Sequence, residues 1–162
     1  MPPQSFRSSA SFGKRQEFIA IAELLRRGFD VYQTLVDDQA IDCILRREVG
    51  SAPKYVDIQI KARSKDTVPK DWALFTLGKI PRPRPNFLFM FFAERTGTYW
   101  IIPSARLTDL AYRKKTGKHV GDYSVLLGNR ATTTFNPRPK FREFEGEAGF
   151  RLLETTFDGL SP

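Results

Sequence analysis

The chain has 162 residues and a formal net charge of +8, from 26 Lys and Arg against 18 Asp and Glu. This length suits one domain with a core of its own. The single cysteine and the single histidine, Cys43 and His119, exclude an internal disulfide, a cysteine-based zinc cluster and a multi-histidine metal site. The positive charge favours polyanionic partners, of which nucleic acid is the commonest, although a basic protein kept soluble by its charge fits it as well.

No apolar run is long enough to span a bilayer, and the first residues lack the apolar core of a signal peptide. One cysteine also suits a reducing compartment. We therefore expect a cytoplasmic protein without a membrane association.

The beginning of the chain predicts an arm followed by a helix. Residues 1–12 are rich in Ser and Pro and predict a flexible N-terminal arm, so that a single domain covers 13–162. A helix should then run to Gly28, a natural stop, with basic residues in its last turn. Its apolar face is predicted from the residues that recur at helical spacing, namely Phe18, Ile21, Ala22 and Leu25.

Three strands should follow this helix. Residues 29–36 and 40–47 are β-prone runs separated by the break "DDQ", and the Gly, Ser and Pro of "EVGSAP" indicate a turn. In the third strand, 54–64, alternation puts Val56, Ile58 and Ile60 on one face. Asp57, Gln59 and Lys61 lie on the other.

The second half of the chain predicts further strands and two helices. Residues 70–80 are ambiguous, with a short helix as one interpretation, and the prolines of 81–86 require a loop. A strand buried on both faces is expected at 87–94 and another at 98–103. The remaining expectations are a helix at 104–117 with Ser104 as N-cap and Gly117 as stop, a strand or turn at 120–129, and a terminal helix at 141–157. This order predicts an α/β (α+β) fold, a central mixed β-sheet flanked by helices.

Four polar residues stand out in these elements. Glu17 lies midway along the first helix, and Asp42 interrupts the apolar run "AIDCIL", where a carboxylate is costly unless it has a partner. Gln59 and Lys61 share one face of the third strand. Adjacent strands and a helix packed across them can bring all four together, and their oxygen atoms suit Mg²⁺. Each of these residues alone also fits an ordinary solvent-exposed position.

This arrangement resembles the PD-(D/E)XK nuclease superfamily, and within it Holliday-junction resolvases and restriction-endonuclease-like proteins. The helix with Glu17, the "AID" that ends in Asp42, and the "IQIK" with Gln59 and Lys61 carry the resemblance, over about residues 13–65. It implies a restriction-endonuclease-like core and a Mg²⁺ (or Mn²⁺) ion bound by Asp42, Gln59 and Glu17. It also implies that Lys61 acts on the attacking water during cleavage of DNA.

The sequence departs from this family at Gln59, where the family usually has an acid. Some members carry glutamine there, and others have lost activity. Two alternatives to a metal-dependent DNA endonuclease therefore stay open: a catalytically weak or inactive nucleic-acid-binding module on the same fold, and a structural or partner-interaction domain. Asp57 is a candidate replacement acid, although it lies two residues too early.

Basic residues near these motifs are candidates for binding nucleic acid, and DNA is the expected partner. A homodimer is compatible with every alternative. Two further basic runs, at 112–118 and 138–142, are candidate phosphate contacts as well. The candidates near the motifs are Lys14, Arg63, Lys65, Lys79, Arg82 and Arg84.

Overall fold

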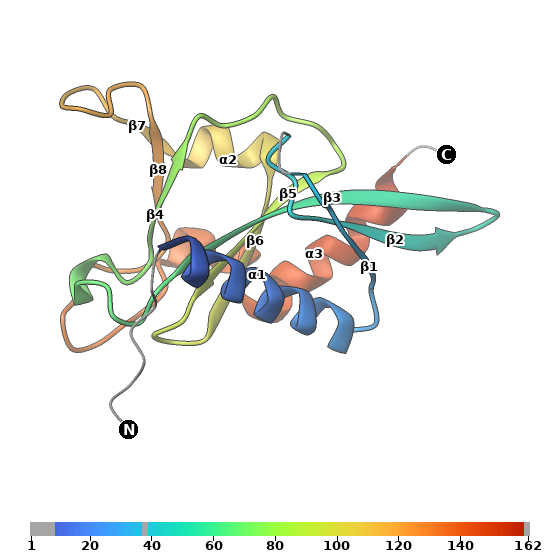
Figure 1. Cartoon of the computed structure of the whole chain (residues 1–162), viewed down its shortest axis with the longest axis horizontal. Helices are drawn as coiled ribbons and strands as arrows, with labels where there is room; N and C mark the ends of the chain where they lie inside the picture. Colours follow the sequence, from blue (N-terminus) through green and yellow to red (C-terminus); the bar gives the residue numbers. More distant parts are fainter. Residues whose placement is uncertain (1–8, 37–38, 161–162) are drawn as a thin grey trace.

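The computed structural model describes residues 9–36 and 39–160, which form three α-helices, eight strands and two short 3-10 turns (Figure 1). The helices are α1 (Ser9–Arg26), α2 (Ser104–Leu110) and α3 (Gly146–Gly159), and the 3-10 turns are Pro69–Asp71 and Pro139–Phe144. The strands are β1 (Asp30–Gln33), β2 (Cys43–Val49), β3 (Ala52–Arg63), β4 (Leu74–Gly78), β5 (Phe87–Ala93), β6 (Thr98–Pro103), β7 (Tyr112–Arg113) and β8 (Tyr123–Leu126).

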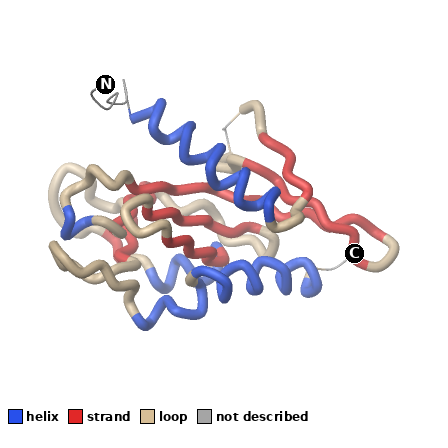
Figure 2. The backbone as a smooth tube through the Cα atoms, turned by 90° about the horizontal axis from the view of Figure 1, so that it is seen from below, coloured by secondary structure: helices blue, strands red, loops and turns tan. Residues whose placement is uncertain are grey.

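The strands form a five-stranded mixed sheet and a smaller antiparallel sheet. The order in the larger sheet is β1-β2-β3-β5-β6, and β3 and β5 are its parallel pair. The smaller sheet has the order β4-β8-β7. Figure 2 shows the long helices lying along the layer of strands. The predicted fold class, a central mixed sheet flanked by helices, is confirmed.

Strand β5 connects two apolar clusters, because its side chains alternate between the faces of the sheet. Leu88 and Met90 join a cluster with residues of α1 and α3, whereas Phe87, Phe89 and Phe91 join one beneath β4, β8 and α2. Every residue of β5 is buried. The predicted strand with two buried faces is therefore confirmed.

Helix α1 buries a different face from the predicted one. Its buried residues are Gln16, Ala20 and Leu24, while Phe18 and Leu25 remain 53% and 54% exposed. The expectation of an apolar face is wrong for positions 18, 22 and 25, whereas Ile21 is partly buried and packs against the core as expected. The buried face is the one with Ala20 and Leu24, which join the apolar cluster shared with β3 and α3. Just after the helix, the Arg27 guanidinium lies 3.5 Å from the centre of the Phe150 ring and pairs with a carboxylate of α3.

Helix α1 begins at Ser9, inside the segment predicted as an arm. Residues 1–8 of that arm, and residues 37–38 of the predicted break after β1, lie outside the described residues. At its other end α1 stops at Arg26, and Gly28 takes a positive φ of 85° as the predicted stop requires.

Three predicted elements have different bounds in the structure. The ambiguous 70–80 region forms β4, which pairs with β8. The predicted 104–117 helix ends at Leu110 because the next residues extend and pair with β8 as strand β7. The terminal helix begins only at Gly146, and a 3-10 turn precedes it. In each case pairing or packing with distant residues overrides the local pattern.

No helix in the described ranges combines the length and the apolar character needed to cross a membrane.

The first prediction concerns the close packing of α3 against β6. A Cβ atom added at Gly149 would overlap the carbonyl oxygen of Phe144 and lie 3.2 Å from the backbone nitrogen of Ile101. We expect Gly149→Ala to lower the free energy of unfolding by about 1–3 kcal/mol, measured by urea denaturation. Gly159→Ala in the same helix is the control, since nothing lies within 4 Å of its added Cβ. Equal stabilities of the two variants would contradict the packing.

Candidate functional site

Asp42 lies where β2 separates from β3, and its carboxylate takes the place of a backbone carbonyl. The last paired residues of the two strands are Cys43 and Ile58, and the amide of Asp42 donates to the carbonyl of Ile58 over 2.9 Å. The next amide of β3 on the side that faces β2 is that of Ile60, which donates to Asp42 Oδ2 over 2.6 Å. This bond fixes the carboxylate on the edge of β3.

The chain reaches Asp42 through a sharp turn. Ala40 has a φ of 57°, a left-handed conformation that costs about 1–2 kcal/mol for a residue with a Cβ. The hydroxyl of Thr34 donates to the carbonyl of Ile41 over 2.6 Å and ties the turn to the end of β1. Backbone strain of this kind is concentrated at functional sites, where surrounding contacts maintain it.

Helix α1 supplies Glu17 from its third turn. The side chain is 19% exposed and pairs with Lys14. The N-terminal half of α1 is held against the sheet by Arg15, whose Nη2 donates to Glu94 Oε1 over 2.6 Å. Glu94 follows β5 and also accepts the amide of Lys65 over 3.1 Å. This link fixes the helix above the end of β3.

Strand β3 supplies Gln59 and Lys61. They lie opposite Phe89 and Phe91 of β5 in the parallel pair, so they leave the sheet on the face away from α1. Gln59 is 7% exposed, and Lys61 is half-buried. No carboxylate of the described residues pairs with the Lys61 ammonium.

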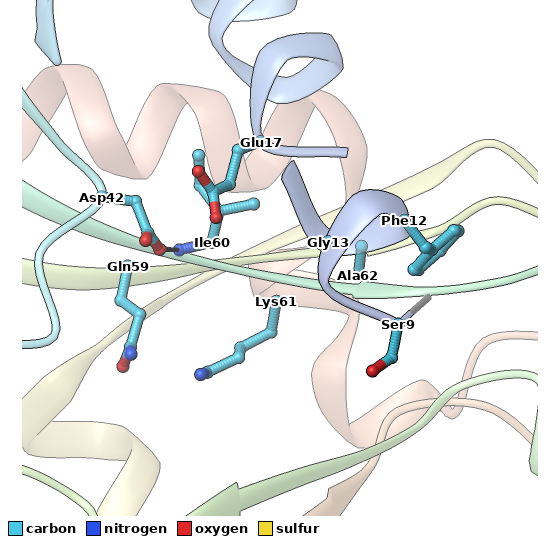
Figure 3. A pocket seen from close by; sticks show the side chains of 9 residues that line it. All are labelled: Ser9, Phe12, Gly13, Glu17, Asp42, Gln59, Ile60, Lys61 and Ala62. Atoms are coloured by element: carbon cyan, nitrogen blue, oxygen red, sulfur yellow. Dashed lines mark hydrogen bonds between the residues drawn. The ribbon is translucent and has the colours of Figure 1, made fainter. Parts of the chain in front are cut away.

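All four residues line one cavity of about 300 Å³. Figure 3 shows Glu17 on the α1 side, the Asp42 carboxylate beside the amide of Ile60, and Gln59 and Lys61 pointing together to the other side. The residues that line the cavity are Ser9, Phe12, Gly13, Glu17, Asp42, Gln59, Ile60, Lys61 and Ala62. The tertiary structure thus gathers the four residues from three elements.

The two carboxylates create a negative field that reaches the neighbouring thiol. The pKa of Cys43 is raised from 9.0 to about 12, first by burial and then by the charges of Asp42 and Glu17. The charges of both carboxylates thus act on the same buried thiol.

The donor atoms of the cavity suit a hard cation better than a soft one. Two carboxylates and one amide oxygen are available from Asp42, Glu17 and Gln59. Among residues 9–36 and 39–160, no group of three or more His, Cys, Asp or Glu could hold a metal ion. Mg²⁺ nevertheless needs few carboxylates, because it keeps several of its waters.

Asp57, the candidate replacement acid, belongs to a different cluster. It forms an ion pair with Arg84, with 3.2 Å between Oδ2 and Nη2, and it does not line the cavity. Burial raises the pKa of its carboxyl group, and the charge of Arg84 opposes this only in part.

The candidate nucleic-acid contacts differ in how firmly they are held. Lys14 pairs with Glu17, and Arg63 donates to the carbonyl of Asp71 over 3.2 Å. Lys65, Lys79 and Arg82 are exposed.

Sequence reasoning missed two links that hold the site, Arg15 with Glu94 and Ser104 with Arg84. A charged residue directly after the buried run of β5 was the available signal for Glu94, whereas Ser104 was interpreted as a helix cap. Its hydroxyl binds the backbone of Arg84 instead.

Comparison with known proteins identifies the fold. No protein-family model and no curated protein matches the chain. A bacterial homing endonuclease, I-Ssp6803I, has a similar structure, with a TM-score of 0.61 and 15% identity, covering 96% of this chain and 99% of its own. D212, a nuclease from a fusselovirus, has a TM-score of 0.52 and 10% identity, covering 98% and 99%. The fold is nuclease-like. At these identities the likeness concerns the fold alone.

The second prediction separates the structural role of Asp42 from any role in chemistry. Asp42→Ala leaves the amide of Ile60 without its acceptor and should lower the free energy of unfolding by about 1–3 kcal/mol, measured in urea. Asp42→Asn keeps a side-chain oxygen at the same place and should unfold close to wild type. Equal losses in both variants would show that the charge, and not the hydrogen bond, holds this edge.

Proposed function

We propose that this chain is a divalent-metal-dependent nuclease that hydrolyses phosphodiester bonds of DNA, with a PD-(D/E)XK-like site in which Gln59 replaces the second acid. The observation that supports it is the convergence of Asp42, Glu17, Gln59 and Lys61 on one cavity. The nuclease-like fold supports the same class of reaction.

The metal in this proposal is Mg²⁺ or Mn²⁺. Asp42, Glu17 and Gln59 would hold it, since their donors are the oxygen atoms that such ions prefer. When bound, the ion would supply Lewis-acid stabilisation of the charge that develops on the phosphate.

In this proposal two protein groups contribute to the reaction: the Asp42 carboxylate, held in place by the Ile60 amide, and the Lys61 amino group, which exchanges a proton with the attacking water. The hydrogen bond from the Ile60 amide fixes the Asp42 carboxylate, so little reorganisation is needed at the moment of reaction. In our proposal the Lys61 amino group orients the attacking water and exchanges a proton with it. Its position beside Gln59, without a carboxylate partner among the described residues, leaves it available to a phosphate oxygen.

DNA is the proposed substrate because of the charge of the chain and its fold. The net charge of +8 favours a polyanion. Candidate phosphate contacts come from α1, from the end of β3 and from residues 79–86, which we call the proline-rich loop. They are Lys14, Arg63, Lys65, Lys79, Arg82 and Arg84.

A binding module that no longer cleaves DNA is the second candidate. It is favoured by the presence of only two carboxylates at the cavity, which would bind a divalent cation more weakly than three.

The third prediction tests cleavage. Wild type should cut plasmid or branched DNA with Mg²⁺ or Mn²⁺, and Asp42→Asn should be at least ~100-fold slower, because loss of a ligand charge removes several kcal/mol of transition-state stabilisation. The rate is measured by gel under single-turnover conditions. Asp158→Asn, an exposed acid on α3, is the control and should cut as wild type does. No cutting by wild type on any substrate would reject the nuclease.

The fourth prediction separates the two candidates through Gln59. For a nuclease, Gln59→Glu restores a third carboxylate, so the Mg²⁺ concentration that gives half the maximal rate should fall several-fold. For a binding module, the added negative charge should only weaken DNA binding in the absence of metal. A variant that cuts DNA at no Mg²⁺ concentration and binds it more weakly would favour the binding module.

A further inference from the structure

Arg84 is the most firmly held cation of the proline-rich loop. Ser104 Oγ accepts a hydrogen bond from the Arg84 amide and donates one to the Arg84 carbonyl, each over 3.0 Å. Ser104 is fully buried at the beginning of α2. This buried hydroxyl, together with the Phe87 amide that donates to the Arg84 carbonyl over 3.2 Å, fixes the backbone of Arg84 in a loop that has no strand pairing of its own.

The side chain of Arg84 is held as well. Its Nη2 pairs with Asp57 Oδ2 over 3.2 Å, and its guanidinium carbon lies 4.8 Å from the centre of the Phe87 ring. The side chain is still 39% exposed, and its Nε is buried without an acceptor. Part of the group is thus presented outward while its orientation is fixed, and it has more donors than the protein satisfies.

The position of this guanidinium follows from the register of β3. Asp57, Gln59 and Lys61 alternate on one face of the strand, so Asp57 lies about 6.6 Å along the strand from Gln59. This separation is comparable to that of neighbouring phosphates in a nucleic-acid strand. Asp57, the ion-pair partner of Arg84, is therefore offset from Gln59 by about one phosphate step along β3.

We propose that Arg84 is a preorganised contact for the backbone phosphate next to the one at the cavity, and that Ser104 is its positioning residue. An arginine already fixed in orientation loses less side-chain entropy when it binds a phosphate. Lys79 and Arg82 of the same loop have no side-chain partner among the described residues, so they would lose more side-chain entropy on binding a phosphate. The inference rests on the proposed function only in that nucleic acid lies along this face, and cleavage is not required.

The fifth prediction uses binding without cleavage. Affinity for a labelled DNA duplex is measured by fluorescence anisotropy in EDTA over a series of salt concentrations. Arg84→Gln combined with Asp57→Asn keeps the wild-type net charge and leaves no unpaired carboxylate. We expect it to bind about tenfold more weakly, with the slope of log K against log salt reduced by about 0.9. Arg82→Gln, which removes a charge from the same loop, should bind less than threefold more weakly.

The positioning role of Ser104 is tested by a DNA-binding measurement that a purely structural role would not change. Ser104→Ala should weaken binding about threefold at a temperature where it is folded, and this effect should vanish in the Arg84→Gln, Asp57→Asn background. An effect of Ser104→Ala that persists there would overturn its role as positioning residue. Equal losses for the Arg84 and Arg82 variants, or an unchanged salt slope, would overturn the phosphate contact.

These outcomes are distinct from those of the cleavage experiment. Cleavage by wild type without any effect of the Arg84 variant would leave the nuclease and reject this contact. The expected binding losses without cleavage would keep the contact and reject the nuclease. Absence of salt-dependent binding by wild type would reject the contact.

Discussion

The hydrogen bond from the Ile60 amide to the Asp42 carboxylate is the interaction on which the site depends. At 2.6 Å it continues the β2–β3 ladder beyond the point where the backbones separate. The Ile60 amide, which has no backbone partner on β2, thereby gains a side-chain acceptor, and the carboxylate is held in one orientation. The left-handed turn at Ala40 is the conformational cost of bringing the chain to this point.

Helix α1 and the proline-rich loop complete the arrangement from two sides. The ion pair of Arg15 with Glu94 holds the helix where Glu17 reaches the cavity. On the other face, Ser104 fixes Arg84 beside Asp57. Both links join segments that are far apart in the chain, and both place a charge next to β3.

Gln59 gives the cavity a neutral amide beside the two carboxylates of Asp42 and Glu17. The pKa of Cys43 is raised first by burial and then by the charges of Asp42 and Glu17, so both carboxylates act on the same buried thiol. A third negative charge would add to these two, yet the nearest further acid on the strand, Asp57, is paired with Arg84. The fold is shared with nucleases, whereas any function depends on the residues of the site.

The sequence by itself determined the strands of the larger sheet and the candidate residues, because alternation along β3 and the continuous apolar run of β5 follow from local side-chain chemistry. It failed for the buried face of α1 and for the end of α2. The face that α1 buries is set by its packing on the cluster that contains Ala20 and Leu24. Helix α2 ends where β7 pairs with β8. Only the tertiary structure decided that Glu17, Asp42, Gln59 and Lys61 share one cavity, since contacts between distant segments set their separations and no local pattern encodes them.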